Sequence, residues 1–125
     1  MRYMMMVKAD RDYEAGIPPS PELMREIGRL TEEMMRAGVI VEVGGLAPSS
    51  KGAKLRLRSG KVSVTDGPFA EAKELIGGYA ILRAASKEEA IALGTRFLEA
   101  HARALGPGYE GELEIRQLFG PGDGA

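Results

Sequence analysis

Two stretches of the chain are apolar on both faces of a predicted strand. Residues 2–8 alternate as a strand does, but large apolar side chains occupy odd and even positions alike: Tyr3, Met4, Met5, Met6 and Val7. Residues 79–82 repeat this pattern. A strand that is apolar on both faces belongs in the interior of a sheet. We therefore expect both stretches to be central strands.

Two amphipathic helices are predicted between strands. The first begins with Ser20 as the N-cap and Pro21 at the first helical position, and Gly38 ends it. Its apolar residues recur at helical spacing: Leu23, Ile27, Leu30 and Met34. The second begins with the capping box at residues 86–89 and runs to about Leu105.

The other strands are shorter and half exposed. Residues 39–43 alternate and end at a pair of glycines, and residues 113–116 form a last strand. Between them, two short alternating runs flank Ser59-Gly60, which is typical of a two-residue hairpin turn. This predicted hairpin carries its charge on one face.

The predicted order is strand, helix, strand, inserted hairpin, strand, helix, strand. Two right-handed strand-helix-strand units side by side make an α+β, ferredoxin-like protomer in which the first strand of each unit is central. Both helices then cover one face of the sheet. A second copy packed face to face would cover the other face and leave a cleft at each end. We therefore expect a homodimer.

Composition narrows the class of protein. The chain has 125 residues and a mass of 13.4 kDa, enough for one domain, which we assign to residues 1–119 with a flexible tail at 120–125. The net charge of -1 argues against a nucleic-acid partner, because the chain as a whole does not attract phosphate groups. With no cysteine and one histidine, the sequence excludes a disulfide, a thiolate nucleophile and a multi-histidine metal centre. No motif indicates a cofactor.

The N-terminal stretch does not resemble a targeting segment. It reaches a charge at Lys8, and no run approaches the ~20 apolar residues that span a bilayer. We expect a soluble, cytoplasmic protein without a membrane partner.

The segment from Asp66 to Glu74 departs from these generic patterns. It reads Asp-Gly-Pro-Phe-Ala-Glu-Ala-Lys-Glu, and Asp-Gly-Pro after a strand is typical of a turn. It closely resembles the signature of the DGPF branch of the YCII-related proteins and differs from it at Ala72. The resemblance extends to further positions: Tyr3-Met4, Gly45-Leu46, Pro48 and Gly77-Gly78-Tyr79.

The resemblance covers about residues 1–119 and implies a dimeric α+β barrel built on ferredoxin-like protomers. Many bacterial proteins of this branch look like companions, by gene neighbourhood, of extracytoplasmic-function sigma factors. The wider group is thought to include enzymes with a His and Asp pair in a cleft. Asp66 is the matching position for the acid. Those enzymes have their histidine nearer the N-terminus, whereas this chain has none before His101.

Asp66 has two interpretations. It is a candidate general acid or base in a cleft that desolvates its carboxyl group. The alternative is a structural Asx-turn, in which the carboxylate accepts a hydrogen bond from the backbone N–H two residues on. Pro68 has no such N–H, which weakens the simplest form of this alternative.

His101 lies in the middle of the apolar stripe of its helix, formed by Ala90, Gly94, Phe97, Leu98 and Leu105. We therefore expect a packed imidazole with a partner for at least one ring nitrogen, either a backbone carbonyl or a carboxylate. A carboxylate partner would make His101 a catalytic companion of Asp66. Helix packing alone also explains its position, and we favour that interpretation.

Other residues near Asp66 are candidates for ligand binding: Gly67, Pro68, Phe69, Glu71, Lys73 and Tyr79. Phe69 and Tyr79 would line a cleft for an organic ligand. Both equally fit the core of a dimer, and we favour that interpretation for Tyr79. Five cations precede the signature in eleven residues: Lys51, Lys54, Arg56, Arg58 and Lys61. They suit an anionic ligand or an acidic partner, but we favour the interpretation that they block edge-to-edge pairing of exposed strands.

Three functions fit these residues. The first is a small enzyme that needs no cofactor and moves a proton on a small organic molecule, with Asp66 as the base. The second is a binding module for a small ligand or a regulatory protein. In the third, the signature is structural and its glycine and proline fix a turn at the dimer seam.

Overall fold

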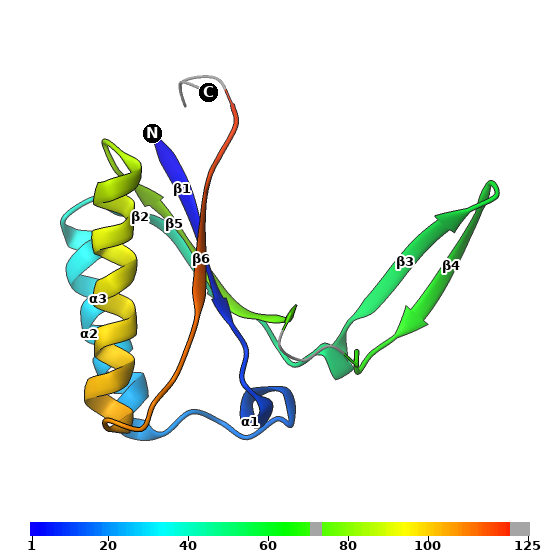
Figure 1. The fold of residues 1–125 in the computed structure, drawn as a ribbon, viewed down its shortest axis with the longest axis horizontal. Helices are drawn as coiled ribbons and strands as arrows, with labels where there is room; N and C mark the ends of the chain where they lie inside the picture. Colours follow the sequence, from blue (N-terminus) through cyan, green and yellow to red (C-terminus); the bar gives the residue numbers. More distant parts are fainter. Residues whose placement is uncertain (71–73, 121–125) are drawn as a thin grey trace.

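The computed structural model of the protein describes residues 1–70 and 74–120 and has an α+β architecture (Figure 1). A four-stranded sheet carries two long helices, and a separate two-stranded hairpin extends from it. The elements in chain order are β1 (Arg2–Lys8), α1 (Arg11–Glu14), α2 (Pro21–Arg36), β2 (Ile40–Gly45), η1 (Ser49–Lys51), β3 (Ala53–Arg58), β4 (Lys61–Asp66), β5 (Ile76–Arg83), α3 (Lys87–Leu105) and β6 (Leu113–Gln117).

The strands of the larger sheet lie in the order β2-β5-β1-β6, each antiparallel to its neighbours. The prediction that β1 and β5 are central is confirmed. Met5 of β1 lies opposite Ala80 of β5 on one side and Ile115 of β6 on the other. This order is compatible with a ferredoxin-like protomer, and within one chain the sheet is open rather than closed into a barrel.

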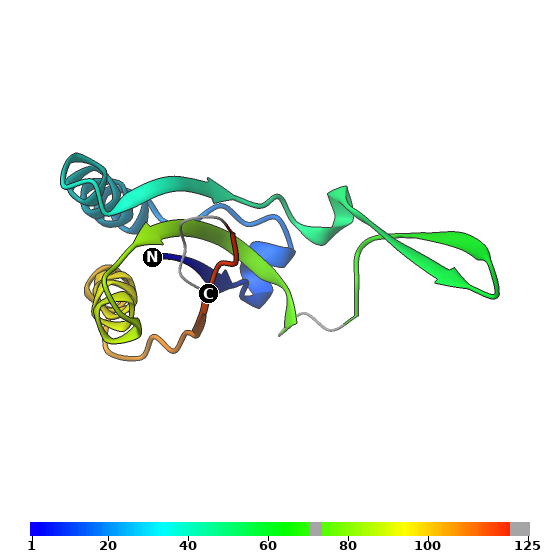
Figure 2. The same cartoon turned by 90° about the horizontal axis from the view of Figure 1, so that it is seen from above.

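Both long helices cover the same face of the sheet (Figures 1 and 2). Each begins at its predicted N-cap: the Oγ of Ser20 accepts from the N–H of Leu23 at 3.2 Å, and that of Ser86 from Glu89 at 3.1 Å. The main core lies between helices and sheet and consists of Met5, Leu30, Met34, Ile40, Ala80, Leu82, Phe97 and Ala100. Neither α2 nor α3 covers the other face of the sheet, which we call the open face.

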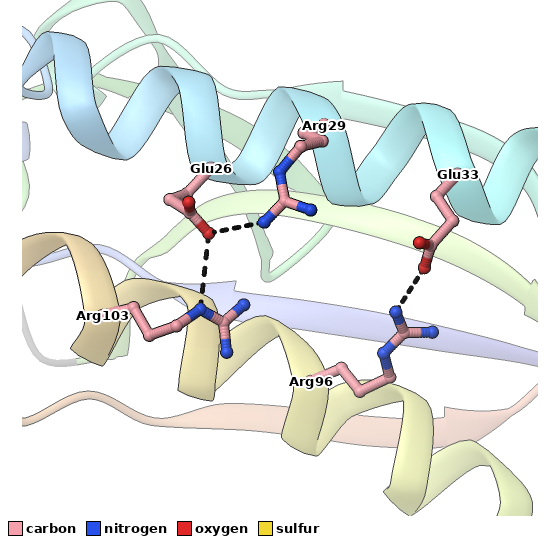
Figure 3. Close-up of polar contacts among 5 residues, drawn as sticks. All are labelled: Glu26, Arg29, Glu33, Arg96 and Arg103. Atoms are coloured by element: carbon pink, nitrogen blue, oxygen red, sulfur yellow. Dashed lines mark hydrogen bonds and ion pairs between the residues drawn. The ribbon is translucent and has the colours of Figure 1, made fainter.

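Ion pairs connect the exposed sides of α2 and α3 (Figure 3). Arg96 donates to Glu33, and the carboxylate of Glu26 accepts from Arg29 at 3.1 Å and from the Nε of Arg103 at 3.4 Å. The hydrogen bond from Arg96, with its charge, lowers the pKa of Glu33. Exposed pairs of this kind add little stability, so the packing of the two helices depends on the apolar core beneath them.

The predicted hairpin is confirmed, and we call residues 53–66 the arm. Its turn has positive φ at Ser59 (51°) and Gly60 (75°), the combination that a two-residue turn with the twist of the flanking strands requires. The arm extends away from the body of the protein on the side of the sheet opposite to the helices (Figures 1 and 2).

Some features differ from the sequence-based expectation. Leu105 was expected in the buried stripe of α3, but it is 42% exposed, because it is the last residue of the helix and lies beyond Ala100, where the buried core ends. The short elements α1 and η1 are too brief to leave a periodic pattern. Apart from Gly120, the predicted tail lies outside the described residues. Among the described residues, no helix has the length and apolar character to cross a membrane.

Candidate functional site

The signature begins at the base of the arm. Asp66 is the last residue of β4 and lies opposite Ala53 of β3. Its side chain is exposed, and within residues 1–70 and 74–120 its carboxylate makes no hydrogen bond and no ion pair. The Asx-turn interpretation therefore finds no bond among these residues.

The turn after Asp66 is fixed to the turn before the arm. The N–H of Gly67 donates to the carbonyl oxygen of Gly52 at 3.0 Å, and that of Phe69 donates to the Oγ of Ser49 at 3.0 Å. A Cβ atom on Gly67 would lie 1.7 Å from the carbonyl oxygen of Ser49. This close approach gives the glycine of the signature a structural reason that involves no ligand.

Glu14 holds Ser49 in place. Its Oε1 accepts from the backbone N–H of Ser49 at 2.6 Å, and its Oε2 accepts from the Ser49 hydroxyl at 2.5 Å. The same hydroxyl oxygen accepts from Phe69, so a continuous polar chain runs from α1 through η1 to the signature. Sequence reasoning missed Glu14 and Ser49, since 35 residues separate them and neither stands in a recognisable motif.

The ring of Phe69 lies against the base of the arm. It is half-buried, and the Nζ of Lys54 stands 4.5 Å from its centroid, within the range of a cation–π contact. One of the five cations before the signature is thus engaged by the signature itself. The aromatic ring serves here as a contact within the chain.

Tyr79 lies on the open face. Its hydroxyl donates to the Oε2 of Glu42 at 2.6 Å, and its ring passes over Gly44, where a Cβ atom would come within 2.7 Å of it. The hydrogen bond to the Glu42 carboxylate is the main reason that the pKa of Tyr79 is raised. The register places three half-buried apolar residues around this pair on the same face: Met4, Met6 and Ile81.

His101 lies in the helix layer. It is half-buried, its Nδ1 lies 2.7 Å from the carbonyl oxygen of Phe97, and its ring stacks on Tyr109 with centroids 5.5 Å apart. Burial raises the pKa of Tyr109, with a smaller contribution from the charge of Asp10. The partner of the imidazole is therefore a backbone carbonyl.

One chain does not bring the two predicted catalytic residues together. Asp66 lies at the base of the arm, whereas His101 lies in α3 on the opposite side of the sheet (Figure 1). Gly67, Pro68 and Phe69 follow Asp66 in the turn, and Tyr79 lies apart from them on the open face. Glu71 and Lys73 lie outside the described residues.

Comparison with known proteins places most of the chain in one family. The family model described as YCII-related domain matches residues 1–103, from β1 nearly to the end of α3. The uncharacterised protein R00369 of Rhizobium meliloti (strain 1021) is 31% identical to this chain over 103 residues, which is 81% of this chain and 78% of that protein. Assignment to the DGPF branch stays a prediction.

Proposed function

The chain belongs to the YCII-related domain family, and on that premise we propose that it acts as a homodimeric binding module. Two copies meet through their open faces, and a cleft between the two sheets, beside Glu42 of the edge strand β2, holds a small organic molecule that carries a hydrogen-bond donor. The observation that carries the proposal is the contact between Tyr79 and Glu42, a polar pair set among apolar side chains on the face opposite to α2 and α3.

The composition of the open face supports the dimer. Its centre consists of Met4, Met6, Tyr79 and Ile81, all half-buried within one chain. Apolar residues of a sheet gain stability when a second layer removes them from water, and the helices occupy the other face. A second copy supplies an identical apolar surface and so makes a self-complementary, two-fold contact.

The Tyr79–Glu42 pair supports the ligand. Binding sites for small molecules are mostly apolar, with a few polar groups that fix orientation. The carboxylate of Glu42 uses one oxygen for Tyr79 and keeps further acceptor capacity, so it suits an amine, an amide or a hydroxyl group. An anionic ligand would meet repulsion at this carboxylate.

Sedimentation equilibrium tests the dimer. We expect the wild type to be a dimer at micromolar concentration and Met6→Asp to be a monomer, since the new carboxylate lies in the centre of the contact. Met24→Asp is the matched control, because Met24 is exposed on α2 and away from the open face. A wild-type monomer, or a dimer that tolerates Met6→Asp, contradicts this part of the proposal.

A fragment screen by amide NMR tests the ligand site. The probes are small amines, amides and alcohols, and we expect binders to shift the amide signals of Gly44 and Tyr79. Tyr79→Phe should weaken those binders, whereas Tyr109→Phe, a change in the helix layer, should not. If the affinity of these binders is the same for Tyr79→Phe as for the wild type, the binding site lies elsewhere.

Acid–base chemistry at Asp66 is the second candidate, favoured by an exposed carboxylate that has no partner among the residues that the structure describes. In one chain His101 does not face it, so an ordered water would have to be its partner. Asp66→Asn separates the candidates: an enzyme loses turnover and keeps its fold, whereas a module that binds beside Tyr79 keeps its affinity.

A further inference from the structure

The arm has one face of charge and one face of apolar side chains. In the β3–β4 register, Leu55 lies opposite Val64 and Leu57 opposite Val62, so these four side chains share a face. The other face carries the cations and small polar residues: Lys54, Arg56, Arg58, Lys61, Ser63 and Thr65. This separation of apolar and charged side chains onto opposite faces is typical of a strand pair that has one face packed against another layer.

Within residues 1–70 and 74–120, the apolar face of the arm stays exposed. The four side chains are 69%, 72%, 61% and 62% exposed at Leu55, Leu57, Val62 and Val64 respectively. The contacts described above join the arm to the body at its base, through Gly52, Phe69 and Lys54. Because a lone two-stranded hairpin is marginally stable in water, this surface needs a cover from outside the chain.

We propose that this apolar face packs on the body of a second copy of the chain, so that each protomer of the dimer reaches across to the other with its arm. This inference rests on the homodimer proposed above and extends its contact surface beyond the open face. The arm and the open face lie on the same side of the sheet, opposite the helices (Figures 1 and 2). A second copy seated on the open face therefore occupies the side on which the arm projects.

The charge distribution of the chain favours contact between the arm and the body of the partner, rather than contact between two arms. The arm contains four cations and one acid, a net charge of +3, in a chain whose net charge is -1. The remaining residues therefore carry -4. An arm against the partner's body joins opposite charges, whereas two arms packed on each other would bring +3 against +3.

Surface area points the same way. A stable interface buries about 800 Å² on each partner. The open face offers four apolar side chains that are already half-buried, which is a small area for a dimer. The arm adds four more that are each over 60% exposed, and two-fold symmetry doubles both contributions.

The test compares two substitutions at neighbouring positions of β4. Val62→Asp places a carboxylate on the apolar face, and Ser63→Asp places the same group on the charged face of the same strand. We expect Val62→Asp to raise the dimer dissociation constant tenfold or more, about 1.4 kcal/mol. Ser63→Asp, which changes the net charge of the arm by the same amount, should weaken the dimer much less. Val62→Thr, which keeps the branched shape, should weaken the dimer less than Val62→Asp.

A second readout follows the arm directly. Methyl NMR of the wild type with a soluble gadolinium chelate measures how much solvent reaches Leu55, Leu57, Val62 and Val64. We expect these methyl groups to be shielded at concentrations where the protein is dimeric and to become accessible in Met6→Asp. Far-ultraviolet circular dichroism of each variant verifies that the body, whose core excludes the arm, stays folded.

The outcomes are distinct. A dimer that Val62→Asp does not weaken, or methyl groups that stay accessible in the dimer, overturns the role of the arm and leaves the open-face dimer standing. A monomeric wild type overturns both, and the apolar face of the arm then points to a different protein as its cover. Weakening by Ser63→Asp equal to that by Val62→Asp also overturns the inference, because the effect would not follow the face.

Discussion

The Oγ of Ser49 accepts a hydrogen bond from the backbone N–H of Phe69 at 3.0 Å and donates one to Glu14 at 2.5 Å. One hydroxyl group thus joins the segment before the arm, the segment after it, and α1. The arm leaves the body and returns to it at this point. Its direction therefore depends on a few polar contacts rather than on an apolar core.

Ser49→Ala should lower the free energy of unfolding by about 1 kcal/mol, since it removes the acceptor of Phe69 and a donor to Glu14 in a half-buried position. Urea denaturation followed by circular dichroism measures the change. Ser50→Ala is the control, because Ser50 is the exposed neighbour. Equal losses in the two variants would show that the contact contributes nothing.

Gly67→Ala should destabilise the protein by about 2 kcal/mol or more, because its Cβ would stand 1.7 Å from the carbonyl oxygen of Ser49 and the turn would have to move. Amide NMR should place the changes at Ser49, Gly52 and Phe69. If Gly67→Ala unfolds at the wild-type urea concentration, the close approach does not constrain the turn.

Gly28→Ala provides the opposite case. Gly28 is exposed in the interior of α2, and a Cβ atom there would meet nothing within 4 Å. Alanine restricts the unfolded chain and favours the helix, so we expect stability to rise by roughly 0.5–1 kcal/mol. The midpoint of urea denaturation measures it, and a fall in the midpoint would contradict the expectation.

Tyr79 should ionise above the usual pKa near 10 while Glu42 is present. Its folded-state pKa is raised, so the contact with Glu42 stabilises the fold below the usual pKa, and this contribution is lost as the pH rises through the raised value. The ultraviolet absorbance of the phenolate, taken as the difference between wild type and Tyr79→Phe, follows the ionisation. Glu42→Gln should move the curve back towards the usual value; a curve that does not move would assign the shift to another cause.

Glu33 should show the reverse dependence. Its pKa is lowered from 4.5, with the hydrogen bond from Arg96 as the largest cause, so its contribution to stability is present above 4.5 and is lost as the pH falls through the lowered value. Carboxyl carbon NMR of Glu33 gives the titration. Arg96→Gln should raise the pKa, whereas Arg25→Gln, on the same helix as Glu33 and paired with Glu22, should leave it in place.

Much of the fold follows from the sequence because the patterns are local. The apolar residues of β1 and β5 on both faces predicted their central places, and Ser20 and Ser86 predicted where the helices begin. Ser59-Gly60 predicted the turn of the arm, since few residue pairs adopt positive φ at both positions.

The candidate site was harder to predict because its contacts are not local. Glu14 and Ser49 meet through the path of the chain, and no periodicity marks either. Asp66 and His101 were paired by residue type, yet they lie on opposite sides of the sheet within one chain. The Tyr79–Glu42 contact depends on the β2–β5 register, which a bulge near Ile40 shifts by one residue.

The place of β1 in the sheet has a consequence for how the chain folds as it is made. β1 leaves the ribosome before the other strands of the sheet, and its two neighbours, β5 and β6, come after residue 75. Its pairing therefore brings together distant parts of the chain, which slows folding compared with local pairing. A nascent chain that stops before residue 113 still exposes one edge of β1, because β6 has not yet been made. The first strand of the sheet to be made is therefore the last to gain both of its neighbours.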